Sequence, residues 1–106
     1  MKYPLNIPSL SPLEKKYVNQ ALKDNWLSIN GKNTKIFEDK FSKQINRKFS
    51  VAVQSGTAAL HTVLRSLGVK DGDNVIVPDY TCVSNLSATS QCRANAIMVD
   101  LEKDTL

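Results

Sequence analysis

Residues 50–68 read SVAVQSGTAALHTVLRSLG, and their pattern is the clearest indication of the fold class. Its first four residues form a short apolar run, which predicts a buried parallel strand. From Thr57 to Leu67 the apolar side chains recur at helical spacing, and Gly68 follows where a left-handed helix cap belongs. A strand joined to a helix by a short glycine-containing loop is typical of α/β proteins.

The same rhythm continues toward the C-terminal end. Gly72 marks a turn into a second predicted strand at 74–77, which Pro78 ends. A helix is expected at about 81–92, and a third strand at 96–99. Strands that alternate with helices at this spacing predict right-handed crossovers and a parallel sheet with flanking helices. The fold class is therefore α/β.

Two amphipathic helices are predicted upstream of the first strand. Ser11-Pro12, with Glu14 three residues after the serine, forms a capping box that begins a helix, and the helix should fade near 24–25. A loop follows, and a second helix is expected from about Thr34, with Phe37 and Phe41 on one face.

The change of rhythm at residue 50 divides the chain. Residues 1–49 are predicted to be an N-terminal helical segment, and residues 50–106 the first strand–helix repeats of a larger domain. A parallel sheet normally needs further strands, so this domain is expected to be incomplete.

Composition narrows the class of protein. A hydrophobic content of 42% and a charged content of 23% are typical of globular proteins. No apolar run approaches a membrane span and no signal peptide is apparent, so we expect a cytoplasmic protein without membrane contact. One histidine and two cysteines argue against a metal site. The net charge of +4 comes from lysines spread along helix faces without interleaved aromatics, which favours solvated faces over nucleic-acid binding.

Two loops lie where an open parallel sheet binds ligands, beyond the carboxyl ends of its strands: 54–58 and 78–82. In the first, Gly56 would let a phosphate approach closely. The amides of Thr57 and Ala58 would point at the ligand, and the Ser55 hydroxyl adds a donor. The same residues also suit an ordinary serine helix cap with a tight-turn glycine, and the spacing alone favours neither interpretation.

Several motifs taken together resemble a known family. They are SGTAALH at 55–61, GDNVIVP at 72–78 with Thr81 three residues further on, and Val99-Asp100. This combination resembles the DegT/DnrJ/StrS family of nucleotide-sugar aminotransferases. Two N-terminal features fit the family pattern as well, namely Trp26-Leu27-Ser28 with Gly31, and Phe37-Glu38. The resemblance covers essentially the whole chain in the family's order.

The resemblance implies a fold and an activity. The chain would form the start of the large domain of an aspartate-aminotransferase-like (type I) fold, which works as a homodimer with pyridoxal 5'-phosphate (PLP). Family members transfer an amino group, usually from glutamate, to a keto group on a nucleotide-linked sugar in polysaccharide or glycan biosynthesis.

The resemblance also implies cofactor-binding residues. The backbone at Thr57 and Ala58, with Ser55 and Gly56, would hold the cofactor phosphate. Cys82 follows Thr81 at the position that lies against the pyridine ring, where the family usually carries an aromatic residue. A packed structural cysteine is an equally supported interpretation of Cys82.

The loop that contains Trp26, Ser28 and Gly31 would border the substrate site. Packing in the core or at the dimer interface is the alternative for Trp26. We expect His61 to be a helix-flank or packing residue and Asp100 to be a cap or turn residue.

No catalytic residue is assigned within this chain. By the family pattern, the lysine that attaches to the cofactor and the acidic partner of its ring nitrogen lie beyond Leu106, so the chain alone is predicted to be inactive. One alternative is a non-transaminating dehydratase relative in which histidine replaces that lysine. Another is a stand-alone phosphate- or nucleotide-binding module, although the chain has neither GxGxxG nor GxxxxGK[ST].

Overall fold

A computed structural model describes residues 6–28 and 30–104 of the chain. It divides into two compact units, an N-terminal unit (Met1–Ala52) and a C-terminal unit (Val53–Leu106). Three parts of the predicted elements lie outside the described residues. They are Ile29 in the predicted loop, residues 1–5 of the helical segment and residues 105–106 of the incomplete domain.

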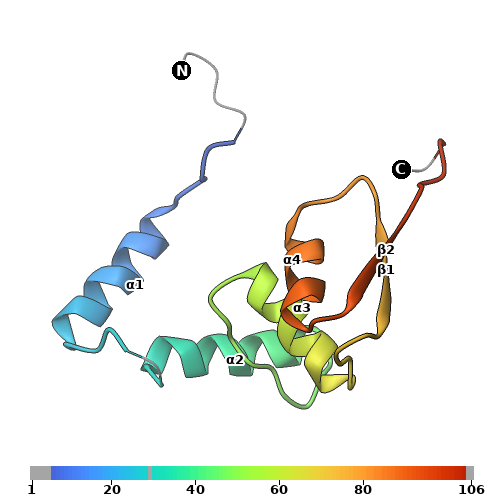
Figure 1. The fold of residues 1–106 in the computed structure, drawn as a ribbon. Coiled ribbons are helices and arrows are strands. Elements are labelled where there is room, and N and C mark those ends of the chain that lie inside the picture. Colours follow the sequence, from blue (N-terminus) through green and yellow to red (C-terminus); the bar gives the residue numbers. More distant parts are fainter. Residues whose placement is uncertain (1–5, 29, 105–106) are drawn as a thin grey trace. The chain divides into compact units, whose positions relative to one another are not determined.

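Helix α1 (Pro12–Lys23) belongs to the N-terminal unit (Figure 1). It begins with the predicted capping box. The Ser11 amide donates to Glu14 Oε2 at 2.7 Å, and the Ser11 hydroxyl accepts the Leu13 amide at 3.2 Å. These bonds satisfy groups that a helix start leaves without partners, which confirms the predicted start.

Helix α2 (Lys32–Gln44) begins two residues before the predicted Thr34. Gly31 is its N-cap in an extended conformation, so the helix can start directly after the glycine. The rings of Phe37 and Phe41 stack with their centroids 5.6 Å apart, as expected for residues one turn apart on one face.

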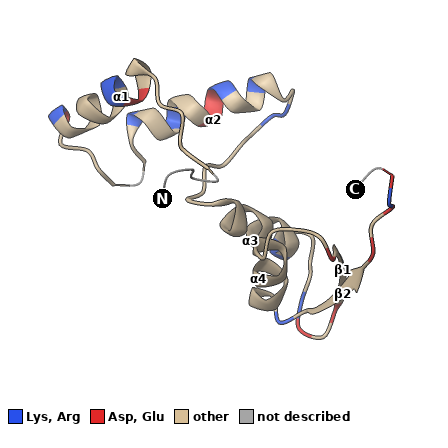
Figure 2. Ribbon diagram, turned by 90° about the horizontal axis from the view of Figure 1, so that it is seen from above, with Lys and Arg blue, Asp and Glu red and all other residues tan. Residues whose placement is uncertain are grey.

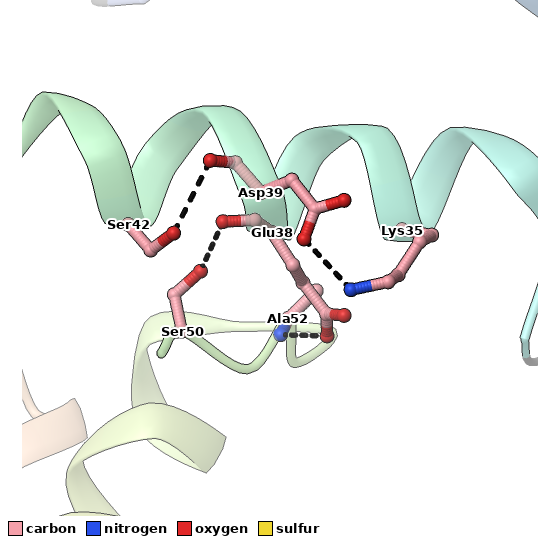
Figure 3. A network of polar contacts seen from close by, with 6 residues as sticks. All are labelled: Lys35, Glu38, Asp39, Ser42, Ser50 and Ala52. Carbon is pink, nitrogen blue, oxygen red and sulfur yellow. Dashed lines mark hydrogen bonds and ion pairs between the residues drawn. The ribbon is translucent and has the colours of Figure 1, made fainter. Parts of the chain in front are cut away.

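The chain after α2 is held to that helix by Glu38 (Figure 3). The Ser50 hydroxyl donates to the Glu38 carbonyl oxygen at 2.7 Å, and the Ala52 amide donates to Glu38 Oε1 at 2.9 Å. The predicted strand at 50–53 is wrong, because these residues form no ladder with another strand. The Ala52 amide, which a sheet would need, is bonded to the carboxylate instead.

The C-terminal unit contains α3 (Gly56–Ser66), β1 (Asn74–Pro78), α4 (Ser84–Gln91) and β2 (Asn95–Val99). Strands β1 and β2 pair in parallel with Asn74 opposite Asn95, and α4 connects them (Figure 1). Helix α3 packs against α4, and α4 packs against both strands. This parallel α/β arrangement confirms the predicted class.

Two predicted glycine turns are present in the C-terminal unit. Gly68 after α3 has a φ of +88°, and Gly72 before β1 has a φ of +82°. Both values lie in the left-handed region, where a residue with a Cβ atom is strained. These glycines therefore end α3 and turn the chain into β1, as the sequence predicts.

The buried apolar core of the described residues is small. It consists of Val77, Ala88 and Cys92, all in the C-terminal unit. Thr89 is buried beside them, and its hydroxyl donates to the Asn85 carbonyl oxygen at 2.9 Å.

Charged residues are distributed along the helices of the N-terminal unit. Figure 2 shows lysines on several turns of α1 and α2. Across the described part of the chain, no helix has the length and apolar character needed to cross a membrane.

Candidate functional site

The start of α3 carries the predicted phosphate-binding residues. Ser55 is the N-cap of this helix in an extended conformation, and its hydroxyl accepts the Ala58 amide at 3.1 Å. The Ser55 carbonyl oxygen accepts the Ala59 amide at 3.0 Å. The Ala58 amide, predicted to point at a ligand, is thus bonded to the capping serine.

Three donors remain at this helix end. In the part of the chain that the structure describes, the amides of Gly56 and Thr57 have no hydrogen-bond acceptor. The Ser55 hydroxyl accepts from Ala58 and keeps its own proton to donate. The partial positive charge of a helix N-terminus favours an anion here.

The space beside Gly56 is open. A Cβ atom at this position would meet no atom within 4 Å, so the surrounding protein does not itself require a glycine. A phosphate group fits this combination of open space, two amides and one hydroxyl.

A hollow of about 340 Å³ lies along the first turns of α3, and we call it the α3 hollow. It brings together Ser55, Thr57 and Ala58, three of the residues predicted to bind the cofactor. Its complete lining is Val53, Gln54, Ser55, Thr57, Ala58, His61, Thr62 and Gln91.

Sequence reasoning missed two notable residues of the α3 hollow. His61 follows Thr57 by one helical turn, so the two share a face, and this spacing could have placed His61 in the site. Gln91 comes from the end of α4, and no local pattern indicates it because only the packing of α4 on α3 brings it there.

Cys82 lies in the loop between β1 and α4 and does not line the α3 hollow. Its side chain is exposed, and hydrogen bonds with Ser84 hold the pKa of the Cys82 thiol below its usual value. The neighbouring Thr81 hydroxyl accepts the Asn85 side-chain amide at 2.7 Å, which ties this loop to the first turn of α4.

A second predicted cluster lies in the N-terminal unit. Trp26, Ser28 and Gly31 line one hollow of about 410 Å³, which we call the Trp26 hollow. A Cβ atom on Gly31 would lie 2.9 Å from Cδ1 of Trp26, so the glycine allows the indole to approach the start of α2. Sequence reasoning did not identify Tyr17 and Asn33, which also line this hollow.

Metal ligands do not converge in the described residues. Within 6–28 and 30–104, no three side chains of histidine, cysteine, aspartate or glutamate are placed to hold a metal ion.

A family model matches residues 8–106, and it describes the DegT/DnrJ/EryC1/StrS aminotransferase family. The chain is 41% identical to GDP-perosamine synthase of Escherichia coli O157:H7, over 99% of this chain and 29% of the relative. It is 36% identical to GDP-perosamine synthase of Vibrio cholerae, over 97% of this chain and 28% of the relative. The chain thus spans less than a third of the length of these relatives.

Solved structures of similar proteins agree with the fold. A sugar aminotransferase from Streptococcus pneumoniae in its PLP form is 34% identical, with a TM-score of 0.87 over 97% of this chain and 26% of the other. The same protein has been solved in a pyridoxamine phosphate (PMP) form. The fold is thus the start of a type I PLP fold, and the chain belongs to the DegT/DnrJ/EryC1/StrS aminotransferase family.

Proposed function

We propose that this chain is the N-terminal part of a PLP-dependent aminotransferase that converts a nucleotide-linked keto-sugar to an amino sugar. Glutamate would be the amino donor, and the whole enzyme would act as a cytoplasmic homodimer in polysaccharide or glycan biosynthesis. One observation carries the proposal: the start of α3 presents two amides that have no acceptor among the described residues, beside open space at Gly56. Membership of the family supports it.

The residues at the α3 start would hold the cofactor phosphate. The Gly56 and Thr57 amides and the Ser55 hydroxyl would donate to its oxygens. Ala58 would act indirectly, because its amide orients the Ser55 hydroxyl. When bound, PLP supplies an electron sink for reactions at the amino-bearing carbon.

The other proposed site residues have separate roles. Cys82 would lie against the cofactor ring, where its exposed thiol offers a smaller contact than an aromatic residue. Trp26, Ser28 and Gly31 would border the sugar, with the indole supplying an apolar surface and Ser28 a polar group. We also propose that the large domain of the enzyme begins at residue 50, after a helical segment at 1–49.

The alternatives have less support. Structures of GDP-4-keto-6-deoxymannose-3-dehydratases are 26% and 27% identical to this chain, with TM-scores of 0.80 and 0.83. The synthases quoted above are more similar in sequence, at 41% and 36%. A stand-alone phosphate-binding module is not favoured either, because the match covers 97% or more of this chain but only part of longer enzymes.

Titration with pyridoxine 5'-phosphate tests the phosphate site, because this analogue lacks the aldehyde that reacts with lysines. We expect the amide NMR signals of Gly56 and Thr57 to shift, and pyridoxine without its phosphate to leave them unchanged. Ser55→Ala should weaken binding roughly three- to tenfold through loss of one hydrogen bond. Unchanged signals at Gly56 and Thr57 in the presence of the phosphate compound would contradict the assignment.

Amino transfer is a separate test. The chain alone should not transfer an amino group from glutamate to a nucleotide-linked keto-sugar, because no residue in it is assigned to the covalent attachment of the cofactor. Turnover by the 106-residue chain in that assay would show that the catalytic machinery has been placed wrongly.

A further inference from the structure

A third hollow, of about 540 Å³, lies beside the C-terminal ends of α3 and α4 in the C-terminal unit. We call it the basic hollow. It shares only His61 and Gln91 with the α3 hollow. Its lining is His61, Arg65, Lys70, Asp71, Gln91, Cys92 and Arg93. Three cationic side chains therefore meet one carboxylate there.

The backbone conformation of Arg93 is unusual for its residue type. Arg93 has a φ of +57°, and the other described residues with positive φ that are not glycine are all asparagines: Asn25, Asn30 and Asn46. Asparagine tolerates this region better than residues with long side chains. The turn itself would thus be served better by asparagine, so the backbone does not account for the arginine side chain.

Backbone hydrogen bonds hold Arg93 in this conformation. Its amide donates to the Ser90 carbonyl oxygen at 2.8 Å, and its carbonyl oxygen accepts the Gly72 amide at 3.1 Å. The guanidinium therefore extends from a fixed turn at the rim of the basic hollow.

The three cations are only weakly neutralised by the protein. Arg93 Nη1 lies 4.0 Å from Asp71 Oδ2, and the two side chains are 82% and 74% exposed, so this pair contributes little. Within the described part of the chain, the Arg65 guanidinium donates one hydrogen bond, to the Val69 carbonyl oxygen at 3.2 Å, and a guanidinium has five donors. Among the described residues, the Lys70 ammonium has no ion-pair partner.

We propose that the basic hollow binds a compact phosphate-type anion carrying at least two negative charges. Guanidinium groups pair with phosphate through two parallel hydrogen bonds, and an ammonium adds a point charge. Both free diphosphate and the diphosphate group of a nucleotide have this chemistry. The site is distinct from the α3 start and does not depend on the function proposed above.

Pyrophosphate titration of the chain, followed by NMR, tests this site. We expect the Nε–H signals of Arg65 and Arg93 to shift, and Arg93→Asn to weaken binding roughly two- to fivefold, as for loss of an exposed charge pair. The asparagine suits the positive φ, so the variant should melt no lower than the parent chain. Lys103→Gln removes a positive charge outside the hollow and should change the affinity by less than the arginine variant does.

The outcomes separate the possibilities. If adenosine diphosphate binds more tightly than pyrophosphate and depends on Arg93 in the same way, the ligand is a nucleotide. If the two compounds bind with equal affinity, the nucleoside contributes nothing and the ligand is the free anion. Two results would overturn the proposal. One is a pyrophosphate affinity that Arg93→Asn does not change, and the other is a titration in which only the amide NMR signals of Gly56 and Thr57 shift.

Discussion

A Cβ atom on Gly31 would lie 2.9 Å from Cδ1 and 3.3 Å from Nε1 of Trp26. Real Cβ atoms do not approach a ring carbon this closely, so an alanine at this position must displace the indole. The glycine and the tryptophan therefore form one steric unit at the start of α2, and both line the Trp26 hollow.

Gly31→Ala should change the environment of the single tryptophan. We expect a shift of the fluorescence emission of Trp26, which is 53% exposed in the parent chain, because the ring has to move away from the added methyl group. Gly56→Ala, a substitution in open space in the other unit, is the control and should leave the emission unchanged. Equal spectra for Gly31→Ala and the parent chain would mean that the indole does not contact residue 31.

Gly56→Val should separate phosphate binding from folding. A Cβ atom at this exposed position would meet no other atom within 4 Å, so we expect the free energy of unfolding to change by no more than about 0.5 kcal/mol. Pyridoxine 5'-phosphate should bind roughly three- to tenfold more weakly if one amide hydrogen bond is lost.

Gly68→Ala is the matched opposite of Gly56→Val. Its φ of +88° strains any residue with a Cβ atom, so we expect a loss of about 1 kcal/mol of stability with phosphate affinity unchanged. Chemical denaturation and the same NMR titration measure both variants. Destabilisation by Gly56→Val together with intact binding would contradict the role of Gly56.

The Cys82 thiol should react faster with alkylating reagents than the Cys92 thiol. Hydrogen bonds with Ser84 lower the pKa of Cys82, so more thiolate is present at a given pH, whereas Cys92 is buried. Ser84→Ala should slow the alkylation of Cys82, measured by mass spectrometry at neutral pH. Ser90→Ala changes an exposed serine on the same helix and should leave the rate of Cys82 alkylation unchanged. Equal slowing by both substitutions would refute the hydrogen-bond explanation.

Acid should weaken the start of α1. Hydrogen bonds from Ser11 lower the pKa of Glu14, so the folded state favours the carboxylate. This contribution is present above the pKa of the unfolded chain, and it is lost as the pH falls through the lowered folded value. The protection of the first turn of α1 against hydrogen exchange, corrected for the intrinsic exchange rate, should therefore fall as the pH is lowered from about 5 to about 3. In the Glu14→Gln variant the side chain does not titrate. The corrected protection of its first turn should therefore stay constant over the same pH range.

Local signals predicted most of the secondary structure. Three of these signals depend only on residues that are neighbours in the sequence, so the sequence alone indicates them. They are the capping box at Ser11, the glycines at 68 and 72, and the apolar run of β1. The helix after β1 begins at Ser84 rather than near Thr81, because residues 79–83 form the loop that Thr81 and Asn85 tie together.

Contacts between distant residues were harder to foresee. The run at 50–53 has the composition of a strand, but a strand also needs a neighbouring strand, and Glu38 takes the Ala52 amide instead. At the candidate site, the Ser55 cap follows from local sequence, whereas Gln91 enters through the packing of two helices. The basic hollow likewise combines α3, the turn before β1 and the end of α4, which no single motif contains.

The location of the three buried apolar residues has a thermal consequence. Val77, Ala88 and Cys92 all belong to the C-terminal unit, and the buried residue described in the N-terminal unit is the polar Ser42. Cooperativity and denaturant sensitivity both grow with the apolar surface that unfolding exposes. On heating, α1 and α2 should therefore lose helicity gradually, while residues 74–99 melt in a sharper transition at higher temperature.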